Sequence, residues 1–380
     1  MKNFVKILLS ILVFGTLSLM AQSNISIIDD RSSKLKRVTK YWKTNWEKHN
    51  VPYGELLSGG PPRDGIPPID NPQFVDAIDA KSWIKDNEPV VFVKINNEVK
   101  AYPIQILIWH EIVNDTLGKK EISVTFCPLC NSTIVFDRNL DGKLYDFGTS
   151  GLLRNSDLVM WDRQSETLWQ QFTGEAIIGD LMGKKLTMLA SSMISFKEYY
   201  TAYPDGKVLS KETGHYRAYG NNPYVGYDDI NNSPFLYNDP IDKRLKPMQR
   251  VVTISGDSSS KAYTYSILKS KKVVNDSFEG KDIVVFYKTG TTSALDGREI
   301  ASSRDVGATA VFRSLLDGTN LEFVYDANLG IIDSKTKSSW NIFGEAVTGK
   351  YRGKTLSQIV HADHFWFSWA AFKPDTLVYK

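Results

Sequence analysis

The feature that most constrains this chain is an internal repeat, because motifs of its first half return in the same order in its second half. K-A-Y at 100–102 returns at 261–263, and V-N-D at 113–115 returns at 274–276, so both pairs lie 161 residues apart (261 − 100 and 274 − 113). Two further pairs keep that order: W-Q-Q-F-T-G-E-A at 169–176 with W-N-I-F-G-E-A at 340–346, and G-K-K-L at 183–186 with G-K-T-L at 353–356. The sequence therefore predicts two copies of one unit.

Each copy begins with strand-like runs and ends in a short aromatic helix, at Ser195–Tyr203 and at Phe365–Phe372. We therefore expect an α+β fold dominated by β structure, with two homologous β-rich units, short helices and long loops. The predicted segments are an export signal at 1–21, an N-terminal extension with a Gly/Pro-rich stretch at 22–88, unit 1 at 89–213, a connector at 214–249 and unit 2 at 250–380.

The segment before unit 1 has few regular elements in its sequence. An amphipathic pattern around Tyr41 to Trp46 predicts a surface helix or extension, and Asp76 to Asp86 is a candidate for a short helix. Between them, residues 51–72 are rich in Gly and Pro, which is typical of an extended segment without regular structure.

The N-terminus has the pattern of an export signal. Lys2 and Lys6 precede an apolar run from Ile7 to Met20, and Ala21 is a small residue suited to cleavage. We expect a mature chain that starts near Gln22 in the periplasm or outside the cell. No second long apolar run exists, so no membrane span is expected in the mature chain. The net charge of +3 is too small to predict a nucleic-acid partner.

Both cysteines of the chain lie in the motif C-P-L-C, at Cys127 and Cys130, between two runs of alternating residues at 122–126 and 133–137. Proline fixes φ for a tight turn that brings both sulfur atoms to the same side. Such a turn has three interpretations: a copper or zinc knuckle, a thiol–disulfide redox pair, or a structural disulfide or pair of buried thiols. In the first, His110 is the expected third ligand.

Comparison of the two copies points to the same residues. With the offset of 161, the positions of Trp109, His110 and Glu111 in unit 1 correspond to Ser270, Lys271 and Lys272 in unit 2, and those of Cys127 and Cys130 correspond to Lys288 and Thr291. Residues that both copies share are better explained by structure. The residues found in unit 1 alone are the better candidates for chemistry.

Three further residues are candidates for the surroundings of this site. Arg154 and Asp157 lie in G-T-S-G-L-L-R-N-S-D at 148–157 and are expected to form a buried pair or to line a cleft. His361 and His364 have the H-x-x-H spacing that would place both on one helix face, and His364 could complete the site if the two units pack face to face. Arg154, Asp157 and His364 are thus predicted, with Trp109 and Glu111, to surround the site or to line its cleft.

Several motifs resemble a prokaryotic family known as domain of unknown function 3179. They are W-H-E-I-V-N-D, V-T-F-C-P-L-C-N-S-T-I-V-F-D-R and R-L-K-P-M-Q-R-V, and the resemblance runs from about Asp64 to Tyr379. It implies that the motifs form one unit, but it implies no activity. Family members usually carry Gly after the second cysteine, where this chain has Asn131, which also tolerates a left-handed backbone.

These observations lead to three functional hypotheses. The first is an exported protein that binds copper or zinc through Cys127, Cys130 and His110. The second is a thiol–disulfide or other redox protein that uses the same two cysteines, and the third is a non-catalytic module that binds a small molecule or partner in an aromatic groove. The absence of C-x-x-C-H, H-E-x-x-H and G-x-S-x-G argues against a c-type haem, a metalloprotease and a hydrolase nucleophile elbow.

Overall fold

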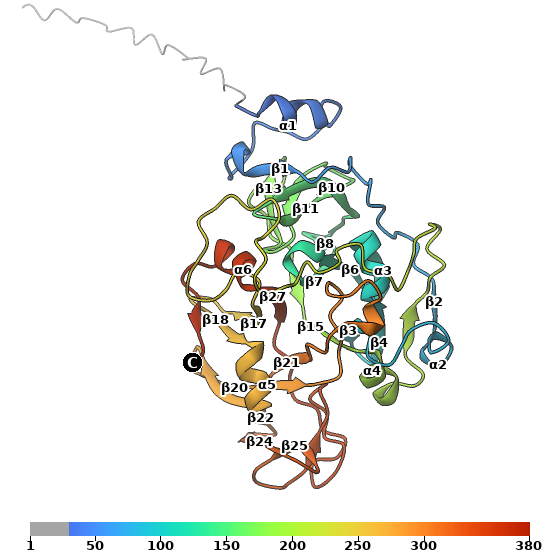
Figure 1. Cartoon of the computed structure of the whole chain (residues 1–380), viewed down its shortest axis with the longest axis vertical. Helices are drawn as coiled ribbons and strands as arrows, with labels where there is room; N and C mark the ends of the chain where they lie inside the picture. The colour runs from blue at the N-terminus through green and yellow to red at the C-terminus, as the bar shows by residue number, and fades with distance from the viewer. Residues whose placement is uncertain (1–29) are drawn as a thin grey trace, which may run out of the picture. The chain divides into compact units, whose positions relative to one another are not determined.

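The chain forms many short strands in several small sheets and only a few short helices (Figure 1). Short runs in which apolar and polar residues alternate favour such strands. The structure is a computed structural model that describes residues 30–380. The predicted β-dominated fold with short helices is confirmed. The predicted export signal at 1–21 and its cleavage site lie outside the described residues.

A five-stranded sheet has at its centre the hairpin of β3 (Pro89–Ile95) and β4 (Glu98–Pro103). The first five residues of β3 are all buried, as expected for the continuous apolar run P-V-V-F-V. β15 (Ser191–Ser195) pairs antiparallel with β3, and β16 (Lys207–Leu209) pairs parallel with β4. β2 (Phe74–Asp76) joins the sheet beside β16.

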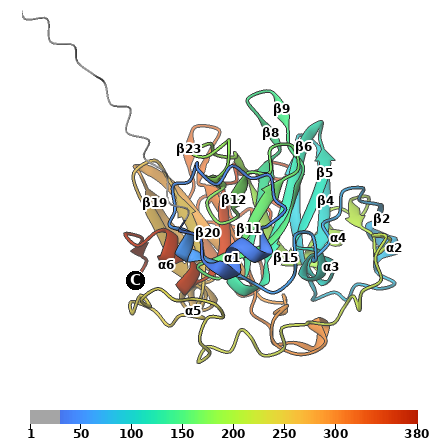
Figure 2. The ribbon, with the colours of Figure 1, turned by 90° about the horizontal axis from the view of Figure 1, so that it is seen from above.

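A second sheet contains the two runs that flank C-P-L-C. β5 (Ile112–Leu117), β6 (Lys120–Cys127) and β7 (Ser132–Asp137) form an antiparallel meander, with β14 (Met188–Leu189) at the edge beside β7. Figure 2 shows β5 and β6 side by side. The helix α3 (Ile104–His110) connects β4 to β5 and is buried at six of its seven positions.

A third sheet, antiparallel throughout, consists of β1 (Leu56–Ser58), β10 (Phe147–Arg154), β11 (Asp157–Asp162), β12 (Leu168–Gln170) and β13 (Glu175–Ile178). The register of β10 against β11 shifts between Thr149 and Leu152, where Gly151 has φ 75°. A Cβ atom there would lie 2.1 Å from the Pro61 carbonyl oxygen, so this bulge requires glycine.

The later part of the chain contains the same kinds of elements in the same order: β17 (Arg250–Ser255), β18 (Ser260–Thr264), α5 (Tyr265–Lys271), β19 (Val273–Phe278), β20 (Lys281–Lys288), β21 (Ala308–Arg313), β27 (His361–Phe365) and β28 (Leu377–Val378). β27 pairs antiparallel with β17 and β28 pairs parallel with β18, as β15 and β16 do with β3 and β4.

Local details also recur between the two parts. The helices α3 and α5 begin 161 residues apart (265 − 104), and each is followed by a residue with positive φ, Glu111 at 58° and Lys272 at 64°. The indole of Trp169 donates to Asp162, and that of Trp340 donates to Asp333. The recurrence is consistent with the predicted duplication, which stays a prediction, as do the unit boundaries.

The remaining helices are α1 (Ser33–Val38), α2 (Ala77–Ala80), α4 (Phe196–Ala202) and α6 (Trp366–Phe372), with single 3-10 turns at Tyr53–Glu55, Pro128–Cys130 and Ile300–Ser302. The remaining strands are β8 (Asn139–Leu140), β9 (Lys143–Leu144), β22 (Leu315–Leu316), β23 (Thr319–Asn320), β24 (Phe323–Asp326), β25 (Gly330–Asp333) and β26 (Ser339–Trp340). α4 and α6 confirm the two predicted aromatic helices.

One helix prediction is wrong, and another is too long. Of the two alternatives for the stretch around Tyr41 to Trp46, a surface helix or an extension, the structure has the extension. The nearby helix is α1, which the Ser32 side chain caps by accepting a hydrogen bond from the Leu35 amide. His361 and His364 lie on the strand β27, not on one face of a helix, because their segment pairs with β17. The predicted helix at 76–86 is limited to α2.

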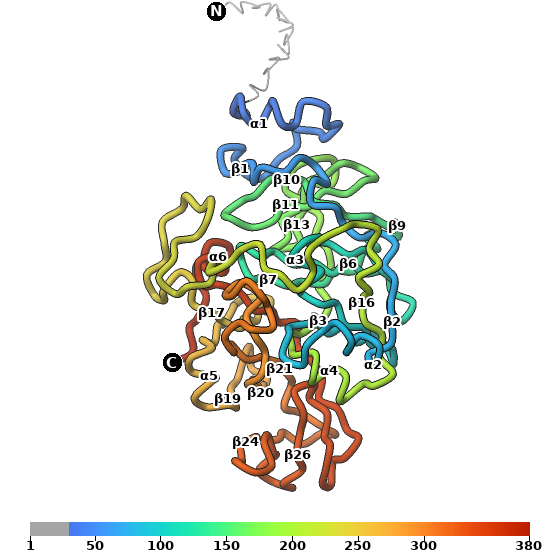
Figure 3. The backbone as a smooth tube through the Cα atoms, turned by 45° about the vertical axis from the view of Figure 1, so that its right-hand side comes forward, coloured from blue at the N-terminus to red at the C-terminus, as the bar shows by residue number. Residues whose placement is uncertain are grey.

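The connector contains no helix or strand of the described chain between β16 and β17, and its yellow trace can be followed in Figure 3. The parts on either side of it share apolar cores. For example, the rings of Phe92 and Phe343 lie 4.6 Å apart between their centroids. Residues 31–380 form one compact unit. Within the described residues, no helix has the length and apolarity that crossing a membrane requires.

Candidate metal centre

The C-P-L-C motif forms a tight turn between β6 and β7. β6 ends at Cys127, the 3-10 turn spans Pro128–Cys130, and β7 begins at Ser132, which is the register partner of Cys127. Asn131 closes the turn with φ 50° and ψ 40°, and its amide donates to the Pro128 carbonyl over 3.2 Å. Both thiols are free and buried. The predicted strand–turn–strand arrangement is confirmed.

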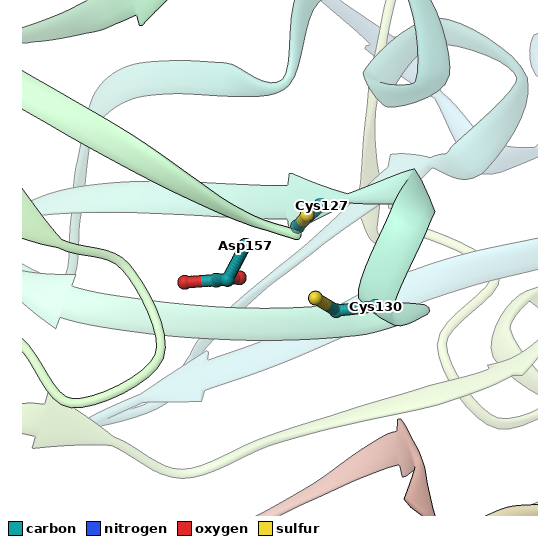
Figure 4. A group of neighbouring side chains, drawn as sticks. All are labelled: Cys127, Cys130 and Asp157. Atoms are coloured by element: carbon teal, nitrogen blue, oxygen red, sulfur yellow. The ribbon is translucent and has the colours of Figure 1, made fainter. Parts of the chain in front are cut away.

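A third acidic group joins the two thiols. Asp157, the first residue of β11, places its carboxylate beside the Cys127 and Cys130 sulfur atoms, and the three potential ligand atoms all lie within 4.8 Å of one another (Figure 4). All three side chains are buried, Cys127 at 2% exposure and the other two at 0%. The centre therefore combines two sulfur atoms and one carboxylate oxygen.

The Asp157 carboxylate is held through one oxygen and unpaired at the other. Its Oδ2 accepts from the Gln170 side-chain amide at 2.6 Å and from the Phe172 backbone amide at 3.0 Å, whereas its buried Oδ1 has no hydrogen-bond partner. A buried polar atom without a partner costs free energy, on the order of 1–3 kcal/mol. A carboxylate oxygen beside two buried sulfur atoms is a donor that a cation can bind.

Burial also shifts the titration of these groups. It raises the pKa of Asp157 to about 7 and raises the pKa of both cysteine thiols, with neighbouring acidic groups adding to the shift of the thiols. Without a cation, the folded protein therefore favours the protonated forms of all three groups. A bound metal ion would reverse this preference, because metal ligands bind deprotonated.

Glu111 lies close to the centre and contributes a fourth acidic group. It follows α3 in a left-handed conformation, and its backbone carbonyl accepts from the Phe126 amide at 2.8 Å, which fixes it against β6. Burial and, secondly, the charge of Asp157 raise the pKa of Glu111 to about 8. The predicted nearness of Glu111 to the cysteines agrees with this arrangement.

Asp157 is connected to other polar residues on the side away from the thiols. The carbonyl oxygen of the Gln170 side chain lies 3.4 Å from Nη1 of Arg154, whose Nε donates to Glu55 over 2.6 Å. Arg154 therefore does not pair with Asp157 directly, in contrast to one of the alternatives from the sequence. It orients Gln170, which in turn holds the carboxylate. Such outer contacts orient metal ligands in known sites.

His110 is not part of the group, which corrects the predicted ligand set. Its Nδ1 lies 2.7 Å from the Pro67 carbonyl oxygen and its Nε2 lies 2.6 Å from the Tyr219 hydroxyl, so both ring nitrogens have partners elsewhere. Burial lowers the pKa of His110 to about 4, so the ring is neutral. The neighbouring Trp109 donates from its indole to the Asn221 carbonyl at 3.2 Å. Both residues fix the connector against α3.

His364 also lies outside the group. Its ring contacts Phe172 and Trp369, with centroids 4.4 and 5.3 Å away, and its Nδ1 is buried without a partner. Burial lowers the pKa of His364 to about 3. The side chain contributes to a separate small pocket between the two parts of the chain, of about 140 Å³. It therefore does not complete the centre.

The connector supplies a feature that the sequence did not predict. Tyr224 and Tyr227 lie near the C-P-L-C turn, and the Tyr227 hydroxyl donates to the Leu129 carbonyl over 3.1 Å. Together with Glu111, Leu129 and Leu158, they line a pocket of about 680 Å³. The richness of the connector in Tyr, Pro and Asn was the available signal, but no periodicity related it to the cysteines.

The environment disfavours thiol–disulfide exchange. Reactive thiols are partly exposed and have a lowered pKa, which a nearby cation or helix N-terminus provides. Here both thiols are buried, their pKa is raised, and their charged neighbours are Asp157 and Glu111. The group therefore has the donor set of a metal site and lacks the features of an activated thiol.

Comparison with known proteins identifies a family and no activity. The family model described as "Protein of unknown function (DUF3179)" matches residues 63–376. Comparisons with curated proteins and with solved structures gave no match. The C-P-L-C turn, Glu111 and Asp157 all lie inside the matched range.

Proposed function

The chain belongs to the DUF3179 family, and we propose that it binds one transition-metal ion through Cys127, Cys130 and Asp157. One observation carries the proposal: two thiols and a carboxylate lie buried within 4.8 Å of one another. No Lys or Arg of the described chain forms an ion pair with this carboxylate, so a bound metal ion would be its cationic partner.

Zinc suits this donor set better than copper. Cuprous copper prefers soft thiolate ligands alone, whereas zinc accepts sulfur, nitrogen and carboxylate oxygen in one site. Three protein ligands leave a fourth coordination position for water, for Glu111 or for an atom of a bound molecule. When bound, zinc would supply Lewis acidity and lower the pKa of such a water molecule. The chain would contribute the ligands, their orientation through Gln170 and a dry surrounding.

Elemental analysis of protein purified without a His tag tests the proposal. We expect one equivalent of zinc in the wild type, little or none in Cys127→Ser/Cys130→Ser, and at least about tenfold weaker binding in Asp157→Asn. His110→Gln is the matched control and should keep the metal. Wild-type protein that stays empty after reconstitution under reducing conditions would refute the proposal. Metal loss in His110→Gln with retention in Asp157→Asn would refute the ligand set.

We also infer that the second set of elements is a duplicated unit without a metal centre. The same offset that relates α3 to α5 places Lys272, Lys288 and Thr291 at the positions of Glu111, Cys127 and Cys130. Two cations stand where the first unit has acidic groups. The double variant Lys288→Ser/Thr291→Ser should therefore leave the metal content unchanged.

The export signal leads to a separate inference about location. Lys2, Lys6 and the apolar run that follows support cleavage before Gln22 and release into the periplasm or the medium. N-terminal sequencing of the protein from fractionated cells tests this inference. A chain that retains Met1 in the cytoplasm would contradict it.

A further inference from the structure

A pocket for ligand binding lies next to the proposed metal centre. It has a volume of about 680 Å³, which is within the usual range for small-molecule sites. The centre lies behind this pocket: Leu129 is between the two cysteines in sequence, Leu158 follows Asp157, and both line the pocket, as does Glu111. A molecule in the pocket would therefore lie beside the proposed metal.

The walls of the pocket are held in place by specific contacts. The Tyr227 hydroxyl donates to the Leu129 carbonyl at 3.1 Å and accepts from the Phe235 amide at 3.3 Å. The Ser156 hydroxyl donates to the Phe235 carbonyl. These bonds join the connector to the cysteine turn and to the turn between β10 and β11. The pocket is thus a preformed feature of the fold and not a space between unattached loops.

The side chains of the lining are mainly apolar and aromatic. Leucine and proline are the most frequent, together with two tyrosines, and among the described residues no Lys, Arg or His side chain lines the pocket. Glu111 is the one carboxyl group that the described residues contribute to the lining, with Asp157 close behind. In the metal-free protein, an anion placed here would therefore lose its water without gaining a cationic partner.

We propose that this pocket binds a small, mainly apolar organic molecule without a negative charge, with one end beside Glu111. In the metal-free protein, this class excludes nucleotides, phosphate esters and carboxylic acids, which require cationic or helix-terminus partners. Binding of this molecule does not depend on the proposed metal. A reaction of the bound molecule at the metal would rest on the proposed function. The tyrosine rings and Phe235 would pack against its apolar body.

Two fluorescent probes that differ by one charged group test the proposal. N-phenyl-1-naphthylamine is uncharged at pH 7, and 8-anilino-1-naphthalenesulfonate adds a sulfonate to the same ring skeleton. We expect the uncharged probe to bind at least about tenfold more tightly. Equal affinity, tighter binding of the sulfonate, or no binding of either probe would overturn the proposal.

Matched variants locate the binding. Phe235 lines the pocket and is 53% exposed, so Phe235→Asp should fold and weaken the uncharged probe at least about tenfold. Leu329, 58% exposed and outside this pocket, provides the control Leu329→Asp, which should bind like the wild type. If Phe235→Asp does not fold, Val225→Asp, also exposed and in the lining, takes its place. Unchanged binding in a folded pocket variant would contradict the proposal.

The probe assay separates this inference from the metal proposal. Cys127→Ser/Cys130→Ser should lose the metal but keep the uncharged probe, because neither sulfur atom lines the pocket. Failure of the metal proposal would appear as an empty wild type that still binds the probe. Failure of the pocket proposal would appear as metal-free protein without selectivity between the two probes.

Discussion

Asp157 is the residue on which the account of the site depends most. The spacing of C-P-L-C allowed the prediction that both sulfur atoms face the same side, because the constraint is local. The proposed third ligand could not be chosen that way, since Asp157 and His110 both lie far from the turn in sequence. Only the packing of β11 against the turn places the carboxylate beside the sulfur atoms, while Pro67 and Tyr219 bind both nitrogens of His110.

The raised pKa values predict how the stability of the metal-free protein depends on pH. Burial raises the pKa of Asp157 from 3.8 to about 7 and that of Glu111 from 4.5 to about 8. At a pH between the unfolded-state and folded-state pKa values of these carboxyl groups, the folded protein binds more protons than the unfolded protein. The free energy of unfolding therefore falls as the pH rises from about 4 to about 8. At about 1.4 kcal/mol for each pKa unit, the loss is on the order of several kcal/mol. Urea unfolding at a series of pH values measures it.

The double variant Asp157→Asn/Glu111→Gln supplies the control for that series. It removes both titrating groups at nearly constant volume, so its stability should depend much less on pH over the same range. A wild-type free energy of unfolding that rises between pH 5 and pH 8 in the absence of metal would contradict the assigned protonation states.

At the scale of elements, the turn between β6 and β7 shows what the sequence could predict. The alternation at 122–126 and 133–137 correctly indicated both strands, and the aromatic helices α4 and α6 were also predicted, because their patterns are local. Around Tyr41 to Trp46, where a surface helix or extension was expected, the chain is an extension in which Trp46 packs against Trp42 and Tyr53. Tertiary aromatic contacts of this kind leave no periodic signal.

Asn131 provides a test of the cysteine turn. Its φ of 50° is unfavourable for residues with a Cβ, except Asn and Asp. We expect Asn131→Gly to change the free energy of unfolding little and Asn131→Ala to lower it by about 1 kcal/mol. In Asn131→Ala the metal should also dissociate faster to a chelator, because the sulfur atoms are held less firmly. If Asn131→Gly lowers the free energy of unfolding more than Asn131→Ala does, contacts of the Asn131 side chain, and not its backbone conformation, stabilise the turn.

At the scale of the whole molecule, the order of helices and strands repeats, but the cysteines and Glu111 of the first part have no counterparts of the same type in the second part. The repeated motifs correctly indicated where strands and helices would recur, since α5, β19 and β20 each lie 161 residues after α3, β5 and β6 (265 − 104, 273 − 112 and 281 − 120). The position of the connector could not be predicted, because a segment without helix or strand has no periodic pattern of apolar residues that shows which side faces the core. Its tyrosines lie near the cysteine turn and form one wall of the pocket.

Metal binding should stabilise the whole compact unit. A ligand that binds only the folded state at 100 times its Kd contributes about 2.7 kcal/mol, so saturating zinc should raise the Tm of metal-free wild type by several degrees. Calorimetry with and without zinc measures the shift. Lys288→Ser/Thr291→Ser should show the same increase, and Cys127→Ser/Cys130→Ser should show none. A zinc effect that survives in the cysteine variant would place the metal elsewhere.

X-ray absorption at the zinc edge of the loaded, untagged protein tests the central claim most directly, because it identifies the atoms bound to the metal. We expect two sulfur neighbours at about 2.3 Å together with oxygen neighbours at about 2.0–2.2 Å, and no imidazole scattering. Loss of the sulfur component in Cys127→Ser/Cys130→Ser should accompany loss of the metal. A first shell without sulfur, or one that contains histidine, would contradict a centre built from Cys127, Cys130 and Asp157.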